Sequence, residues 1–185
     1  MKKSITTFLK HPTKDSSNRS ANPAVIRAST ILFNTMQELY QHEKKIKKHQ
    51  KISHYSYGRY GSSTTIELEN ILKELEQAFH VFLTGTGFGG VALAIMSLCR
   101  PGDEILVSDN VYGPTKEISE KLLKEFNVIA KFYNPDSFED LKSKVSKKTK
   151  MILVENPGSN TFEFQDLSKI VSLAKKKKIF TFLDN

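Results

Sequence analysis

The chain has 185 residues, of which 38% are hydrophobic and 26% are charged. This balance permits a buried core and excludes a wholly disordered polypeptide. No window approaches about 18 consecutive apolar residues, so we expect no membrane-spanning helix, and the N-terminus lacks the apolar run of a secretory signal. The single cysteine, Cys99, excludes a disulfide framework and a CxxC metal site, and it favours a reduced, cytoplasmic setting.

The net charge of +8 raises the possibility of a nucleic-acid or anionic-lipid partner. Arginine is the preferred residue for bidentate phosphate contacts, yet only Arg19, Arg27, Arg59 and Arg100 are present. The lysines cluster at positions 44–51 and 175–178, which we expect to be solvated. We therefore expect neither a nucleic acid nor a membrane as partner.

The first part of the chain, residues 1–60, is polar and predicts an extended arm with a short helix near 35–50. A capping box, Thr64-x-x-Glu67, predicts a helix that continues to Phe79. A short apolar run at 81–84 predicts a strand, and the glycine cluster after it precedes an apolar helix at 91–99. A strand at 104–108 and a helix ending at Phe126 follow.

The rest of the chain continues the alternation of strands and helices. We predict strands at 128–133, 151–154 and 179–183, a helix from a second box at Ser137-x-x-Asp140 to about Val145, and a helix carrying Leu167 and Ile170. The strands are short and continuously apolar, as buried parallel strands are. The fold class is therefore α/β, with a largely parallel sheet and helices on both faces.

Ligands of open α/β sheets bind just past the carboxyl ends of the strands. Past the predicted strands lie a glycine-rich segment (85–90), a loop with Tyr112, the segment 155–160 and Asp184. The glycine segment has free N–H groups for an anion such as phosphate, and Asp109 follows at the distance of a dinucleotide fingerprint. A glycine-rich turn that only allows close helix packing is an equally good interpretation.

Three further residues have two interpretations each. Asp184 caps a turn, or it pairs with a protonated ring nitrogen of a cofactor. Tyr112 is a surface tyrosine, or it stacks on a planar ring. The segment Tyr57-Gly58-Arg59 is a polar aromatic loop, or its arginine binds a phosphate.

Six stretches of the sequence, taken together, resemble the trans-sulfuration family of pyridoxal-phosphate enzymes, which process cysteine, homocysteine and cystathionine. They are AVIRAST (24–30), YGRYGSSTT (57–65), GTGFGGVALAI (85–95), PGDEILVSDNVYGPT (101–115), ILVENPGSNTFEFQD (152–166) and FLDN (182–185). The resemblance implies a fold-type I enzyme, in which residues 61–185 are an incomplete cofactor-binding domain behind the arm. It also implies pyridoxal 5'-phosphate as cofactor, a small amino-acid substrate and a homo-oligomer.

The resemblance also implies roles for single residues. Gly87 and Phe88 would offer backbone N–H groups to the cofactor phosphate, and Tyr112 would stack on the pyridine ring. Asp184 would hold the pyridinium N–H. Tyr57 and Arg59 match a Tyr-x-Arg motif that reaches the phosphate of a neighbouring subunit.

The run Pro157-Gly158-Ser159-Asn160 resembles the cystathionine β-lyase subgroup, although the γ-synthase, γ-lyase and methionine γ-lyase subgroups stay open. The lysine that carries the cofactor in the family lies beyond the aspartate that matches Asp184, so we expect no catalytic residue within this chain. We therefore expect an N-terminal fragment that is inactive alone. Half of a split enzyme completed by a second chain, or a non-catalytic interaction module, are the alternatives.

Overall fold

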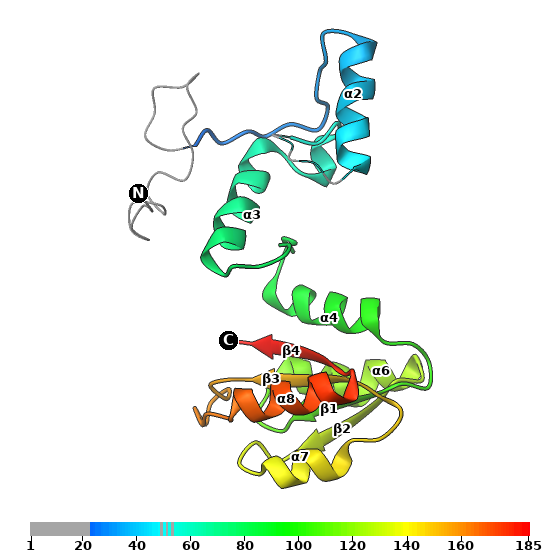
Figure 1. The fold of residues 1–185 in the computed structure, drawn as a ribbon, viewed down its shortest axis with the longest axis vertical. Coiled ribbons are helices and arrows are strands. Elements are labelled where there is room, and N and C mark those ends of the chain that lie inside the picture. Colours follow the sequence, from blue (N-terminus) through cyan, green and yellow to red (C-terminus); the bar gives the residue numbers. More distant parts are fainter. Residues whose placement is uncertain (1–22, 49, 51, 53) are drawn as a thin grey trace. The chain divides into compact units, whose positions relative to one another are not determined.

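The computed structural model describes residues 23–48, 50, 52 and 54–185. Contacts divide the chain into two units, Met1–Leu83 and Thr84–Asn185, and each is described by itself (Figure 1). The part of the predicted arm that covers residues 1–22 lies outside the described residues.

The described part of the first unit contains helices and extended segments. An extended segment leads to helix α2 (Met36–Lys47), then to the short 3₁₀ helix η1 (Gly58–Tyr60) and helix α3 (Ser63–Leu75). The Thr35 hydroxyl accepts from the Glu38 N–H at 3.1 Å, which starts α2. Helix α2 therefore confirms the helix predicted near 35–50.

The predicted capping box at Thr64 is wrong by two residues. Helix α3 begins after Ser62, whose N–H donates to the Thr65 hydroxyl at 2.9 Å. The Thr64 hydroxyl is engaged elsewhere, because it accepts from the Ile26 N–H at 2.8 Å and donates to the Ala24 carbonyl at 3.1 Å. Thr64 thus ties the extended segment to α3 instead of capping the helix.

The second unit alternates helices and strands. In chain order it contains α4 (Gly87–Leu98), β1 (Glu104–Ser108), α5 (Gly113–Glu117), the π-helical turn η2 (Ile118–Leu122), α6 (Leu123–Glu125), β2 (Ile129–Tyr133), α7 (Phe138–Lys144), β3 (Thr149–Glu155), α8 (Leu167–Lys177) and β4 (Phe180–Asp184). The strands form a parallel sheet in the order β2-β1-β3-β4. The predicted parallel α/β fold is confirmed.

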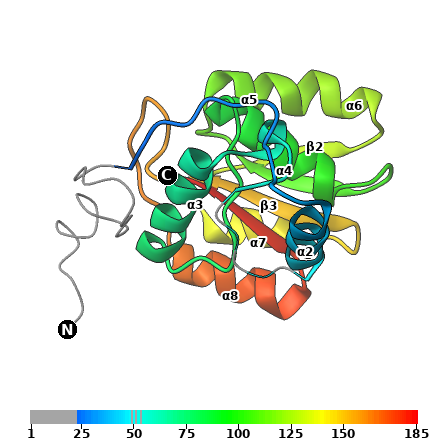
Figure 2. The ribbon, with the colours of Figure 1, turned by 90° about the horizontal axis from the view of Figure 1, so that it is seen from above.

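The core of the second unit lies on both faces of this sheet. Successive residues of a strand point to opposite faces. Ile105 and Val107 accordingly belong to one buried cluster with α4 and α6, while Leu106 belongs to another with α7 and α8. Figure 2 shows α5 and α6 on one side of the strands and α7 and α8 on the other. The predicted cover of helices on both faces is also confirmed.

The strand predicted at 81–84 is wrong. These residues form no strand in the structure, and the Phe82 side chain is exposed. The apolar run there meets no neighbouring strand, so only its composition favoured a strand. Helix α4 begins at Gly87, earlier than the predicted start at 91, because the Thr86 hydroxyl accepts from the Gly89 N–H at 2.9 Å and caps it.

None of the helices in the described part of the chain is long and apolar enough to cross a membrane.

Candidate functional site

Two carboxylates meet at the carboxyl edge of the sheet. Strands β3 and β4 end at Glu155 and Asp184, which are register partners across the parallel pair. The Asn156 N–H donates to the Asp184 carbonyl at 3.0 Å. Because directly paired residues of neighbouring strands project to the same face, both side chains lie on one face of the sheet.

Glu155 also holds the loop that follows β1. Its Oε2 accepts from the backbone N–H of Tyr112 at 2.6 Å, and the Tyr112 carbonyl accepts from the Lys116 N–H at 3.1 Å. The backbone of Tyr112 is therefore fixed on both sides, while its side chain remains 51% exposed. The ring is available to a planar partner at this edge.

The electrostatics of Glu155 reflect this crowded position. Burial raises the pKa of its carboxyl above the ordinary value, and the Asp184 carboxylate raises it further. Hydrogen bonds from the Tyr112 N–H and the Ser159 hydroxyl act in the opposite direction. A cation at this place would relieve the repulsion between the two carboxylates.

The glycine segment lies at the start of α4. Helix α4 packs on the sheet through Val91, Ile95 and Cys99, and it begins at the side of the second unit where β4 ends (Figure 1). A Cβ added at Gly87 would meet nothing within 4 Å, and the Phe88 side chain is 40% exposed. There is thus open space beside the first residues of α4, while the Gly89 N–H is bonded to the Thr86 hydroxyl; a helix start of this kind can bind an anion.

A buried network of hydrogen bonds connects the strand ends at this edge. The Gln165 amide nitrogen donates to the Ser108 hydroxyl at 2.9 Å and to the Glu155 carbonyl at 3.2 Å, while its oxygen accepts from the Tyr133 hydroxyl at 2.8 Å. Burial raises the pKa of Tyr133 to about 12. The network joins the ends of β1, β2 and β3, so it fixes the strands that carry the loops above.

The loop after β3 approaches the loop after β1 closely. The Ser159 N–H donates to the Asn110 carbonyl at 2.9 Å. A Cβ added at Gly158 would lie 2.2 Å from the side-chain nitrogen of Asn110, which is itself buried. Glycine at 158 therefore allows the two loops to meet.

Tyr57 and Arg59 belong to the first unit, whereas Gly87, Phe88, Tyr112 and Asp184 belong to the second. Tyr57 pairs with Thr30 in an isolated antiparallel bridge. The Arg59 guanidinium carbon lies 4.9 Å from the centroid of the Tyr57 ring and 5.8 Å from that of Tyr60. The two rings hold the arginine head by cation–π contacts.

Two lysines of the second unit, Lys116 and Lys150, have partners near the sheet. Lys116 is half-exposed, and its Nζ lies 2.6 Å from Asp109 Oδ1 and 5.2 Å from the Phe132 ring centroid. The hydrogen bond to Asp109 raises the pKa of Lys116. Lys150 lies at the start of β3, at the opposite edge from Glu155, with its Nζ 5.3 Å from the Phe180 ring centroid.

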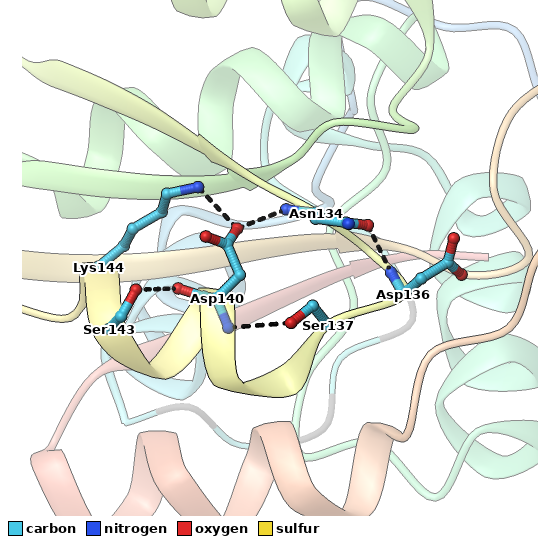
Figure 3. A network of polar contacts seen from close by, with 6 residues as sticks. All are labelled: Asn134, Asp136, Ser137, Asp140, Ser143 and Lys144. Carbon is cyan, nitrogen blue, oxygen red and sulfur yellow. Dashed lines mark hydrogen bonds and ion pairs between the residues drawn. The ribbon is translucent and has the colours of Figure 1, made fainter.

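A shallow hollow lies beyond the end of β2, lined by residues 132–135 with Asp109, Ser137, Asp140 and Lys144. Its polar groups pair with one another (Figure 3). Asp140 accepts from Lys144 at 2.6 Å and from the Asn134 N–H at 2.8 Å, and the Asp140 N–H donates to Ser137 at 3.2 Å. Ser137 caps α7 as predicted, but the Asp140 carboxylate does not complete the box. The polar groups of the hollow are thus those that fix the start of α7.

The sequence does not predict two residues of this edge as site residues. It places Glu155 only within the segment 155–160, and it gives Gln165 no role. An acidic residue at the very end of a buried strand is the signal that marks Glu155. Gln165 has no such signal, because its role depends on which strands lie side by side.

Comparisons with known proteins found a family and a fold that this chain is similar to. The model of the family described as "Cys/Met metabolism PLP-dependent enzyme" matches residues 6–185. A Bordetella avium protein named cystathionine beta-lyase is 31% identical, over 99% of this chain and 46% of its own length. A Saccharomyces cerevisiae protein, to which the same activity is assigned provisionally, is 35% identical over 92% of this chain and 47% of its own length.

Solved structures share the fold. A Campylobacter jejuni structure that carries N'-pyridoxyl-lysine-5'-monophosphate superposes with a TM-score of 0.85 at 23% identity. It covers 98% of this chain, which in turn covers 44% of that structure. The chain thus spans less than half the length of the relatives it matches.

Proposed function

The chain belongs to the Cys/Met metabolism family of PLP-dependent enzymes, and on that premise we propose that it is the N-terminal portion of a cystathionine β-lyase-like enzyme. The reaction would be β-elimination of cystathionine to homocysteine, pyruvate and ammonia. The names of the two relatives support this choice of substrate. The single observation that carries the proposal is the edge at which Tyr112, Glu155 and Asp184 meet.

The residues of this edge fit pyridoxal phosphate. The open helix start at Gly87 and Phe88 would receive the phosphate, because the N-terminus of α4 offers N–H groups and the positive end of the helix dipole. The exposed ring of Tyr112 would lie against the pyridine ring, and Asp184 would pair with its nitrogen. When bound, the cofactor supplies an electron sink for the bond broken at the substrate.

The side chains of this chain would hold and orient the cofactor ring. The Asp184 carboxylate would keep a proton on the ring nitrogen, because an opposite charge within hydrogen-bonding reach favours the protonated form. The Tyr112 ring would cover one face and exclude water from it. Hydrogen bonds fix the backbone of both residues, so their main chain would need little reorganisation when the cofactor binds.

We also propose that the 185 residues have no lyase activity alone. Lys116 is held by Asp109 and Lys150 lies at the opposite edge of the sheet, so neither amine suits proton transfer at the substrate. In the full enzyme Tyr57 and Arg59 would reach the phosphate of a neighbouring subunit, in a homo-oligomer of cytoplasmic location. The Arg59 guanidinium, which the Tyr57 and Tyr60 rings position, is a group of the kind that binds phosphate.

Cystathionine cleavage tests the proposal directly. The chain is assayed alone, then co-expressed with a second chain that supplies the part of the Bordetella relative that these residues do not match. We expect no cleavage from either chain alone and cleavage from the pair, with loss of the activity in Asp184→Ala. Binding of the two chains without any cleavage would favour an interaction module instead, and cleavage of another amino acid in preference to cystathionine would replace the substrate.

A further inference from the structure

Glu155 links the two residues of the edge that the proposed function uses, Tyr112 and Asp184. Its Oε2 receives the Tyr112 N–H at 2.6 Å. Its backbone lies in register with Asp184. Its carboxylate is partly buried, at a place where a second negative charge stands beside it.

An ionised carboxylate at position 155 costs free energy, and its contacts indicate a structural role that offsets this cost. Burial and the neighbouring charge both disfavour the ionised form. The residue gains in return a short hydrogen bond to a backbone N–H that belongs to another loop, 43 residues away in the chain. That loop leads directly into the continuous helical stretch of α5, η2 and α6, in which Thr115 and Leu123 are buried.

We infer that Glu155 is a positioning residue, whose carboxylate fixes the main chain of Tyr112 beside Asp184 and thereby sets where a ring stacked on Tyr112 can lie. The direction of a Cα–Cβ bond follows from the backbone, so a fixed N–H and a fixed carbonyl restrict the tyrosine ring to a few rotamers. The inference rests on the proposed function only for the identity of the stacked ring.

Backbone hydrogen bonds fix the position of Glu155, which the positioning role requires. Its carbonyl accepts from the Gln165 amide at 3.2 Å, and the next residue, Asn156, donates to the Asp184 carbonyl at 3.0 Å. The side chain therefore stands on a strand end that is held from two sides. A side chain on a rigid element transmits position to the loop that it binds.

Two substitutions of Glu155 distinguish the hydrogen-bond acceptor from the negative charge. Glu155→Gln keeps an oxygen that accepts from the Tyr112 N–H, and Glu155→Ala removes the acceptor. Glu117→Ala is the control, because Glu117 is an exposed acid on α5 whose ion pair is with Lys121. The first readout is hydrogen exchange of the Tyr112 amide in the whole chain without cofactor.

We expect the Tyr112 amide to exchange at least about tenfold faster in Glu155→Ala, since a hydrogen bond to a charged acceptor is lost. In Glu155→Gln and Glu117→Ala the rate should stay close to that of the wild type. The Leu153 amide, inside β3, should be unchanged in all three variants. Unchanged exchange at Tyr112 in Glu155→Ala would overturn the inference, as would equal acceleration at Tyr112 and Leu153, because that would mean a general loss of stability.

The second readout is the circular dichroism that bound pyridoxal phosphate acquires at its own absorption band. At saturating cofactor, Glu155→Ala should lose most of this signal and Glu155→Gln should keep most of it. A full signal in Glu155→Ala would contradict the positioning role. If the wild type binds no pyridoxal phosphate, the proposed function fails, and the amide exchange of Tyr112 still decides the role of Glu155.

Discussion

In the second unit, strands β1 and β3 bury nearly every side chain, with Ile105, Leu106, Met151 and Ile152 fully inaccessible. In the first unit, by contrast, helix α2 buries none of its residues and α3 buries only Ile66. Exposed apolar side chains of the first unit include Leu32, Tyr40 and Phe79. Both units come from one chain of ordinary composition, so the difference lies in how each segment is packed.

This contrast indicates that the two units are stabilised by different interactions. The second unit has a core on each face of its sheet, and burial of apolar surface is the dominant favourable term in folding. The described segments of the first unit are joined by polar contacts such as the Thr64 hydroxyl to Ala24 and Ile26, and by the bridge of Thr30 to Tyr57. We expect the candidate edge to be rigid because it belongs to the unit with the core.

The largest effect is expected from a core substitution in the second unit. Leu106→Ala should lower the free energy of unfolding by about 2–5 kcal/mol, because Leu106 is fully buried and the neighbours would not fill the cavity. Leu32→Ala is the matched control in the first unit, where the side chain is 89% exposed, and should change stability by less than about 0.5 kcal/mol. Urea unfolding followed by circular dichroism measures both. Similar losses in the two variants would remove the contrast between the units.

A smaller loss is expected from the polar network beneath the edge. Gln165→Leu should cost about 1–3 kcal/mol, because the Tyr133 hydroxyl and the Ser108 hydroxyl would lose partners in a buried place. Gln41→Leu, at an exposed position of α2, is the control and should have little effect. Urea unfolding of the two variants is the measurement. A neutral Gln165→Leu would mean that water satisfies these groups.

A third substitution tests the first unit alone. A Cβ at Gly58 would lie 1.9 Å from the Ala28 carbonyl oxygen, and the Gly58 N–H donates to the Ser29 carbonyl at 2.7 Å. Gly58→Ala should therefore cost this unit about 1–3 kcal/mol and release the segment that carries Tyr57 and Arg59.

The measurement for Gly58→Ala is hydrogen exchange of the amides of residue 58 and Ile26, which should accelerate relative to the wild type while the Leu153 amide stays protected. Gly85→Ala is the control, since a Cβ there meets nothing within 4 Å. Faster exchange at Leu153 as well would show that the two units do not respond separately.

The smallest effect concerns pH. The Ser146 hydroxyl, at 2.5 Å, and the Lys131 ammonium, at 2.9 Å, lower the pKa of Glu104 below its ordinary value. A carboxyl whose pKa is lower in the folded state than in the unfolded state stabilises the protein at any pH above its unfolded-state pKa. This contribution is lost as the pH falls through the lowered pKa of the folded state. Thermal unfolding from pH 7 down to pH 3 should therefore show a steeper loss in the wild type than in Glu104→Gln. Parallel curves would contradict this.

The strands of the second unit could be predicted because their buried runs are short, apolar and separated by turn residues. The run at 81–84 has the same composition, and only the absence of a neighbouring strand there distinguishes it. Single-sequence patterns do not contain that information. The start of α3 was misplaced for a related reason, because Thr64 has the right chemistry for a cap and uses it for a contact 40 residues away.

The site could be predicted in part. Tyr112 and Asp184 follow from the rule that ligands bind past the strand ends, and the structure places both at that edge. The role of Glu155 depends on the register of β3 with β4 and on a hydrogen bond to a distant loop. Register and strand order are properties of the folded sheet, so the sequence marks Glu155 only as an acidic residue at a strand end and does not reveal its links to Tyr112 and Asp184.

The most direct test of the account is a titration of the whole chain with pyridoxal phosphate, followed by borohydride reduction and mass measurement of the peptides. We predict saturable one-to-one binding that Asp184→Ala weakens, with no lysine of this chain modified stoichiometrically. A stoichiometric reduced pyridoxyl adduct on one lysine, or no saturable binding at all, would contradict the claim that this edge holds the cofactor while the reactive lysine comes from elsewhere.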